Sequence, residues 1–255
     1  MSALLDIDHL TQYFGGLRAV SDFSIHMEHG EIVGLIGPNG AGKTTVFNVL
    51  TGVYAPTKGT IVFDGKSIAG KKTHVITQAG IARTFQTIRL FSKSSVIDNI
   101  KIAYHFRMTY GDADAFLHTR KYWAGEQFVD EYAYSLLKIF HLEGHADDVA
   151  GSLPYGAQRR VEIARALATK PRLLILDEPA AGMNPAEADE LMTMIRWLRD
   201  KFDLTVLLIE HQMRVVMGVC ERIKVMDFGE TICEGVPEHV RNDPRVCEAY
   251  LGKGA

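Results

Sequence analysis

The chain has few of the features that would place it inside a membrane or in an oxidising compartment. Its 255 residues include three cysteines, Cys220, Cys233 and Cys247, an odd set without close pairing, which predicts reduced thiols in a cytoplasmic protein and no zinc site. No stretch approaches the roughly 18 apolar residues that a bilayer-spanning helix needs. The opening MSALLDIDHLTQYF carries acids where a signal peptide needs a basic start. We therefore expect any membrane role to depend on partner proteins.

An excess of positive charge is also missing. The net charge is −3, so the chain lacks the broad positive field of a dedicated nucleic-acid binder, which weakens that class without excluding it. No internal repeat or low-complexity tract is visible. A chain of 255 residues can bury a substantial core, and we expect one large α/β domain with room for an inserted subdomain.

A glycine-rich loop follows an apolar, strand-like run early in the chain. Residues 32–36 read IVGLI and residues 37–44 read GPNGAGKT. The glycines let backbone N–H groups turn inward around an anion, Lys43 adds a positive charge, and the Thr44 hydroxyl can hold Mg²⁺. Chance produces such a pattern in on the order of one chain in a hundred. The preceding strand, and a helix expected over 45–50 that Gly52 can stop, favour a nucleoside triphosphate site instead.

Strand-like and helix-like segments alternate along much of the chain, which predicts a largely parallel sheet covered by helices. The run 60–63 ends at Asp64-Gly65, a turn that predicts an antiparallel piece in the N-terminal portion. From about 96 to 169 the apolar spacing is helical, which predicts an inserted helical subdomain. Residues 107–125 fit no regular pattern.

Charged side chains follow two later strand-like runs. The run 173–176 ends in Asp177-Glu178-Pro179, and the run 205–209 ends in Glu210-His211. If these strands are parallel, their carboxyl ends share the sheet edge where doubly wound folds bind ligands. Asp177 can then hold Mg²⁺, Glu178 can polarise a water aimed at a γ-phosphate, and His211 can reach the same phosphate.

Each of these residues also has an ordinary structural explanation. An isolated acidic pair more often closes a strand, and a lone histidine is more often structural or solvated. The phosphate loop upstream favours a functional role for the acidic pair over a purely structural one. The position of His211 after a buried strand likewise favours a functional role for the histidine. Downstream, Asn184 as a cap, Pro185 in the first turn and Glu187 behind it predict a helix reaching toward Arg199.

The segment LPYGAQRRVEIARAL, residues 153–167, is a weaker candidate for an anion site. A glycine at the start of an amphipathic helix exposes N–H groups and the positive helix end. Pro154 and Gly156 could merely start a helix, with Arg159, Arg160 and Arg165 forming a solvated face. A second anion site would be redundant within one subunit, so we expect this one to complete the nucleotide site of another subunit.

Taken in this order, the motifs resemble the ATP-binding-cassette (ABC) family over essentially the whole chain. GPNGAGKT resembles the Walker A loop, residues 173–178 the Walker B strand, LPYGAQRR the signature, and AGMN at 181–184 the D-loop. Gln86 in RTFQ resembles the Q-loop glutamine, His211 the switch histidine, and Phe14, with Tyr13 beside it, the aromatic residue that stacks on adenine. The closer resemblance is to ATP-binding subunits of Liv-type branched-chain amino-acid importers, through FGGLRAV, GPNGAGKTTVFNVLTG, RTFQTIRLF, YGAQRRVEIARALAT, DEPAAGMNP and EAYLG.

The resemblance implies a fold and a division of the chain. The expected fold is α/β, with a P-loop NTPase (RecA-like) core, a mainly parallel sheet, an N-terminal antiparallel β portion and an inserted α-helical subdomain. The whole chain, 1–255, would be a single ABC ATP-binding domain. Its nucleotide-binding core would cover about 1–90 and 170–255, and its helical signature subdomain about 91–169.

The resemblance also implies ATP and Mg²⁺ as cofactors and a role for each site residue. Glu178 would orient the attacking water, while His211 and Gln86 would sense the γ-phosphate and Mg²⁺. Thr44, Gln86 and Asp177 would hold Mg²⁺. The expected ATP-binding residues are Phe14, Gly37, Pro38, Asn39, Gly40, Ala41, Gly42, Lys43, Thr44 and Thr45, together with Leu153, Tyr155, Gly156, Ala157 and Gln158 of the facing subunit.

The chain departs from the wider family at two motifs. The usual LSGGQ is here LPYGA, residues 153–157, so a serine hydroxyl and one glycine are missing. We expect the backbone donors near Gly156 to carry the contact with the partner's γ-phosphate. Asn184 stands where many relatives have Asp, which keeps a hydrogen-bonding group but removes a charge.

By resemblance, two cassettes pack head to tail and hydrolyse ATP between them, so that the dimer opens and closes. The implied partners are integral-membrane permease subunits, a second cassette and, indirectly, an external substrate-binding protein, with no nucleic acid. Liv-type systems use two different cassettes. The sequence does not decide between such a heterodimer and a homodimer. The implied location is the cytoplasmic face of the cell membrane, where the chain would be held peripherally by the permease.

Other interpretations stay open. The cassette could serve urea or short-amide uptake, or lipopolysaccharide export. A soluble ABC ATPase acting on ribosomes or DNA is disfavoured, because translation factors of the family carry two cassettes and the repair members carry long coiled coils or zinc modules. A regulatory module without turnover is disfavoured by the presence of Glu178 and His211. Substrate choice lies with the permease and binding protein, because the cassette never touches the substrate.

Overall fold

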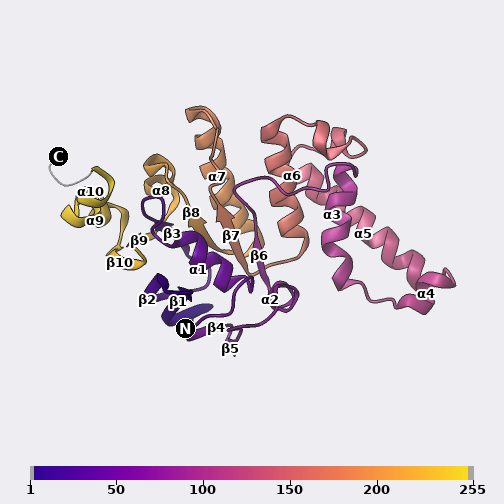
Figure 1. Ribbon diagram of the computed structural model, residues 1–255. Helices are drawn as coiled ribbons and strands as arrows, with labels where there is room; N and C mark the ends of the chain where they lie inside the picture. Colours follow the sequence, from indigo (N-terminus) through magenta and orange to yellow (C-terminus); the bar gives the residue numbers. More distant parts are fainter. Residues whose placement is uncertain (1–2, 252–255) are drawn as a thin grey trace. The chain divides into compact units, whose positions relative to one another are not determined.

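A six-stranded sheet contains all three of the buried strands that the sequence predicts (Figure 1). Its order is β10-β9-β3-β8-β7-β6, and every neighbouring pair is parallel except β9 with β10. The predicted, largely parallel sheet is therefore confirmed, and five strands end at one edge. Its strands are β3 (Ile32–Ile36), β6 (Ile81–Arg83), β7 (Leu173–Asp177), β8 (Thr205–Ile209), β9 (Arg222–Asp227) and β10 (Glu230–Gly235).

The computed structural model describes residues 3–251, and these fall into two compact units. The core unit consists of Met1–Arg83 and Arg172–Ala255, and the helical unit is Thr84–Pro171. The two sheets found among residues 3–251 belong to the core unit. The predicted assignment of a nucleotide-binding core and a signature subdomain to these parts of the chain stays a prediction.

The second sheet is antiparallel and lies in the N-terminal portion, as predicted. Its order is β2-β1-β4-β5. Asp64 and Gly65 join β4 to β5 with φ angles of 49° and 71°, which is the left-handed pair that a tight two-residue hairpin turn requires. The strands are β1 (Leu5–Phe14), β2 (Leu17–Met27), β4 (Lys58–Phe63) and β5 (Lys66–Ser67).

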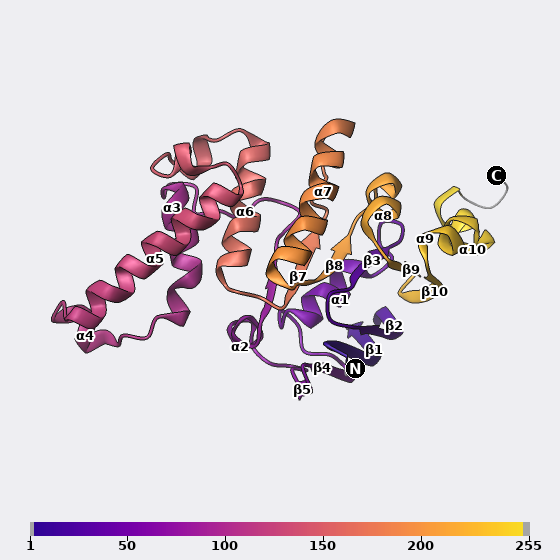
Figure 2. The same cartoon turned by 180° about the vertical axis from the view of Figure 1, so that it is seen from behind.

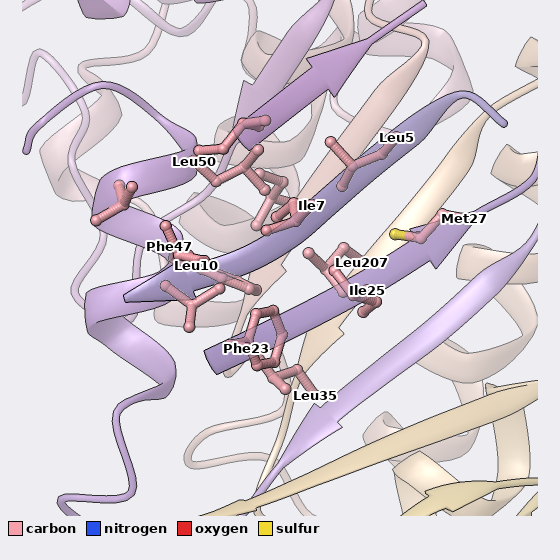
Figure 3. Packing of buried hydrophobic residues seen from close by; sticks show 14 of the residues in the cluster. Leu5, Ile7, Leu10, Phe23, Ile25, Met27, Leu35, Phe47, Leu50 and Leu207 are labelled. Atoms are coloured by element: carbon pink, nitrogen blue, oxygen red, sulfur yellow. The ribbon is translucent and has the colours of Figure 1, made fainter. Parts of the chain in front are cut away.

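The main hydrophobic cluster joins this antiparallel sheet to helix α1 (Lys43–Leu50) and to one face of the larger sheet (Figure 3). On β1 the buried apolar residues are Leu5, Ile7 and Leu10, a spacing that changes from two to three. The register of β1 shifts at this point and His9 has a φ of 51°, so a bulge returns Leu10 to the buried face. The cluster therefore anchors α1, which follows the glycine-rich loop directly.

Small side chains let helices approach the opposite face of the larger sheet. A Cβ atom at Gly34 would lie 2.9 Å from Cys220 Sγ and 3.4 Å from Val216 Cγ1, so helix α8 (Met213–Val219) packs against this glycine. Helix α7 (Pro185–Phe202) packs beside α8 and begins as predicted, because the Asn184 side chain accepts hydrogen bonds from the N–H groups of Ala186 and Glu187. The remaining core helices are α2 (Thr73–Ala79), α9 (Pro237–Asn242) and α10 (Pro244–Leu251).

The helical unit contains no strand among its residues 84–171, which confirms the helical pattern (Figure 2). Its helix α3 packs against both α5 and α6. The irregular stretch 107–125 contains α4 and the start of α5, and rings such as Tyr110 and Tyr122, 5.1 Å apart, organise it. Within residues 3–251, no helix is both long and apolar enough to cross a bilayer. The helices are α3 (Val96–Tyr104), α4 (Asp112–Phe116), α5 (Arg120–Ile139) and α6 (Tyr155–Ala168), with short 3-10 turns η1 (His105–Arg107), η2 (Glu143–His145) and η3 (Ala150–Ser152).

Candidate nucleotide site

The glycine-rich loop between β3 and α1 has a backbone that only glycine adopts easily. Gly37, Gly40 and Gly42 have φ angles of 151°, 83° and 101°. A Cβ atom at Gly37 would lie 2.1 Å from the carbonyl oxygen of Met226, and one at Gly42 would lie 2.7 Å from that of Ala19. The loop is therefore a concave turn packed against its neighbours, and it leads into the amino end of a helix, where anions bind.

Lys43, the first residue of α1, directs its charge back into this loop. Its Nζ donates hydrogen bonds to the carbonyl oxygens of Gly37, at 2.6 Å, and Pro38, at 2.9 Å. Burial lowers the pKa of Lys43, while the negative charges of Glu178 and Asp177 act in the opposite direction. The ammonium group thus lies within the field of both carboxylates, and the loop fits a polyphosphate carrying a divalent cation.

Asp177 ends β7 with a buried carboxylate that is held by an arginine. Its Oδ2 lies 2.7 Å from Nη2 of Arg83, at the end of the neighbouring strand β6, and the two side chains are 9% and 6% exposed. Nη1 of Arg83 donates to Oδ1 of Asn48 on α1, at 2.8 Å. Asp177 is thereby fixed relative to the helix that carries Lys43 and Thr44. Arg83 is not among the predicted site residues, although it is the first residue of the RTFQ motif that contains Gln86.

Glu178 and His211 come together at the ends of the adjacent strands β7 and β8. His211 Nδ1 lies 3.5 Å from Oε2 of Glu178. Glu178 has a φ of 47°, a conformation uncommon outside glycine, and its N–H donates to the carbonyl oxygen of Ile209 at 2.9 Å. The Glu178 side chain remains 18% exposed, whereas His211 is 55% exposed. This sharp turn aims a carboxylate away from the strand, beside the imidazole, as the parallel arrangement predicts.

Glu210, which the sequence analysis left without a role, joins the two loops that carry Glu178 and His211. Its side chain is fully buried, and its carboxylate accepts hydrogen bonds from the N–H groups of Ala180, at 2.8 Å, His211, at 3.0 Å, and Gln212, at 3.1 Å. Gln212 Nε2 donates to the carbonyl oxygen of Ala180 at 2.8 Å. A buried acid directly before the histidine is thus a positioning group for both loops.

Phe14, the expected adenine-stacking residue, lies at the end of β1 and is 40% exposed. Its ring meets Tyr54 edge to face, with the ring centroids 5.1 Å apart. This contact orients the Phe14 ring and leaves part of its face open. Its stacking on adenine stays a prediction.

Gln86 and the predicted residues of the segment 153–158 belong to the helical unit. Gln86 is exposed in a segment without regular structure, 84–90. Tyr155 and Gly156 are exposed at the start of α6, while Leu153 and Ala157 are buried and the Gln158 amide donates to the carbonyl oxygen of Leu153 at 2.7 Å. The start of α6 is thus exposed, and its contact with a facing subunit stays a prediction.

Cys233, His239 and Asp243 place their ligand atoms within 4.8 Å of one another, a grouping that resembles a metal site. Asp243, however, binds Arg245 through both carboxylate oxygens. Burial, with a hydrogen bond to Asp243, raises the pKa of Cys233 to about 11. A protonated thiol and an arginine-bound carboxylate make this an internal polar contact that joins β10 to α9 and α10.

Two family models match this chain. The family model described as ABC transporter matches residues 20–181, and the model described as branched-chain amino acid ATP-binding cassette transporter matches residues 230–255. The high-affinity branched-chain amino acid transport ATP-binding protein LivG of Escherichia coli (strain K12) is 45% identical over 98% of each chain. The protein BraF of Pseudomonas aeruginosa, with the same description, is 44% identical over 98% of each chain.

Solved structures show the same fold. A crystal structure of an ATP-binding cassette of an ABC transporter in its ADP conformation is 32% identical, with a TM-score of 0.85, and covers 99% of this chain and 100% of that one. A nucleotide-free cassette is 31% identical, with a TM-score of 0.84, and covers 98% of this chain and 100% of that one. The α/β P-loop NTPase fold predicted from the motifs is confirmed.

Proposed function

The chain belongs to the ABC transporter family, and on that premise we propose that it is the ATP-hydrolysing subunit of an importer for branched-chain amino acids. The observation that carries the proposal is the convergence of Lys43, Asp177, Glu178 and His211 on one sheet edge. The substrate class rests on relatives that are 44–45% identical over 98% of the chain and on the C-terminal family match.

In the proposed reaction, Glu178 orients and polarises a water that attacks the γ-phosphorus, and the bond to the oxygen bridging to the β-phosphate breaks. Lys43 and the loop N–H groups stabilise the negative charge of the transferred phosphoryl group. His211, 3.5 Å from Glu178, contacts the γ-phosphate and keeps the carboxylate directed toward it. Bound Mg²⁺ would neutralise charge on the phosphate oxygens, and Thr44, Gln86 and Asp177 are the residues proposed to hold it.

The proposed assembly follows from the exposed start of α6. Tyr155 and Gly156 would complete the nucleotide site of a facing cassette, and the exposed Gln86 segment would receive a cytoplasmic element of the permease. We propose a second, different cassette as the partner, at the cytoplasmic face of the membrane. The lipopolysaccharide export protein LptB of Escherichia coli (strain K12), at 37% identity, makes export the less favoured alternative.

The proposal is tested by purifying the tagged chain from its own membranes in mild detergent and reconstituting what co-purifies into vesicles. We expect two permease proteins, a second cassette and ATP-dependent uptake of leucine. Lys43→Ala should weaken ATP binding by about tenfold or more, because the loop loses its charge at the phosphates. Lys58→Ala, an exposed lysine on β4, is the matched control. Recovery of ribosomes or DNA, or unchanged affinity in Lys43→Ala, would contradict the proposal.

A further inference from the structure

Arg159 on α6 is buried, contrary to the solvated face that the sequence leaves open for it. Its residue surface is 1% exposed, whereas its neighbour Arg160 is exposed. A guanidinium carries five N–H donors and keeps its charge, so burial requires several acceptors around it. The acceptors that surround Arg159 therefore indicate what the residue holds in place.

Two of these acceptors belong to the backbone around Gln86. Arg159 Nη1 donates to the carbonyl oxygen of Phe85 at 2.7 Å, and Nη2 donates to that of Gln86 at 2.9 Å. Nη1 also donates to Oε2 of Glu162 at 2.7 Å, and Nη2 also donates to the hydroxyl of Tyr155 at 3.0 Å. One planar side chain thus connects the first turn of the signature helix to the peptide groups of the glutamine segment.

Glu162, one turn further along α6, binds the donors of the same segment. Its Oε1 accepts from the N–H groups of Phe85 and Arg89, each at 3.3 Å. Arg165, a further turn along, donates to the carbonyl oxygen of Arg89. Residues 84–90 lie outside any helix or strand, so their backbone N–H and C=O groups lack the regular hydrogen bonds of a helix or sheet. Side chains of α6 provide hydrogen bonds to several of these groups instead.

We propose that Arg159 and Glu162 are positioning residues that make the glutamine segment and the start of α6 one rigid piece. The inference rests on the proposed function. A displacement of Gln86 by nucleotide or permease is then passed to Tyr155 and Gly156, which act on the nucleotide of the facing cassette. The two ATP sites and the permease are thereby linked through one helix face, without a contact between Arg159 and any nucleotide.

The test is Arg159→Lys in the complete transporter, since lysine keeps the charge but cannot reach both carbonyl oxygens with a planar fork. We expect kcat for ATP to fall about tenfold and the stimulation by substrate-loaded binding protein to disappear. KM for ATP should stay within about twofold, because the substitution leaves the glycine-rich loop and Lys43 of the core unit unchanged. Arg120→Lys, an exposed arginine of the helical unit, should behave as the wild type.

Two results would overturn the proposal. One is a transporter containing Arg159→Lys that keeps its kcat and its stimulation. The other is a variant in which KM rises while kcat and stimulation remain, since that pattern marks general support of the nucleotide site. A wild-type transporter that neither binds nor hydrolyses ATP would instead refute the proposed function, so the wild type is measured first.

Hydrogen exchange on the wild-type transporter tests the same link without a substitution. The N–H groups of Phe85 and Arg89, which Glu162 binds, should exchange as slowly as those in the middle of α6, such as Ile163. They should also open together with α6 when denaturant is added. Exchange at the rate of an exposed loop would show that the segment is independent of the helix and would overturn the proposal.

Discussion

Each of the two units contains a buried arginine–carboxylate pair, and the pairs serve different ends. Arg83 and Asp177 in the core unit, and Arg159 and Glu162 in the helical unit, each approach to 2.7 Å with both side chains less than 10% exposed. In the core pair the carboxylate is itself a proposed Mg²⁺ ligand. In the helical pair the carboxylate binds backbone N–H groups of a loop. The comparison teaches that the same buried interaction can fix the end of a strand, as in the core unit, or fix a segment without regular structure, as in the helical unit.

Neither pair is explained by stability alone. Replacing a whole buried ion pair by apolar residues is often neutral, whereas removing one partner costs about 3–5 kcal/mol because a charge is left uncompensated. Burial raises the pKa of Glu162, while the charge of Arg159 acts to lower it. Both pairs therefore fix a local geometry, which we propose serves ATP hydrolysis in the core unit and coupling to the facing cassette in the helical unit.

The largest effect should come from removing the chemistry while leaving both pairs intact. Glu178→Gln should lower ATP turnover by about 10²–10⁴-fold, because an amide cannot polarise the attacking water as a carboxylate does. ATP binding should remain, and an ATP-bound dimer should accumulate, which gel filtration and phosphate release would measure. Glu190→Gln, an exposed acid on α7, is the control. Normal phosphate release by the Glu178 variant would remove this residue from its proposed role.

The next largest effect should come from breaking the core pair, and it should appear in the free energy of unfolding. Arg83→Met should lower the free energy of unfolding by about 3 kcal/mol, because the buried carboxylate of Asp177 then loses the guanidinium that compensates its charge. The double variant Arg83→Met with Asp177→Leu should recover part of that loss in denaturant titrations. Arg18→Met, which breaks an exposed pair with Glu230, should cost less than about 1 kcal/mol. Equal losses for the buried and exposed pairs would contradict the distinction drawn here.

Gly156→Asp, in the helical unit, should have the smallest effect on the isolated chain. It should change turnover only in the assembled transporter. No atom lies within 4 Å of a Cβ built at Gly156, and an acid at a helix start is favourable, so folding and the chain's own ATP affinity should not change. Turnover in the assembled transporter should fall about tenfold, because the new charge faces the partner's phosphates. Gly144→Asp, at an equally open position of the helical unit, is the control. Wild-type turnover would separate the signature from the nucleotide site.

Continuous apolar runs made the buried strands predictable. Strands β3, β7 and β8 are buried on both faces, so their sequences carry no polar alternation and their ends are marked by glycine or acid. Residues 107–125 were not predictable, because aromatic packing such as that of Tyr110 with Tyr122 organises them and this has no period along the chain. Their short helix α4 has five residues, too few for a clear helical pattern.

The amino-acid sequence by itself determined the glycine-rich loop, the strand-like runs that end in Asp177, Glu178 and His211, and the family. These features depend on the backbone freedom of glycine and on which residues follow a strand, and both can be recognised from residues close together in the sequence. Only the tertiary structure decided that the side chains of Arg83, Arg159 and Glu210 are buried. Their partners include groups up to 94 residues away, and a charged side chain looks the same in sequence whether water or a distant carboxylate surrounds it.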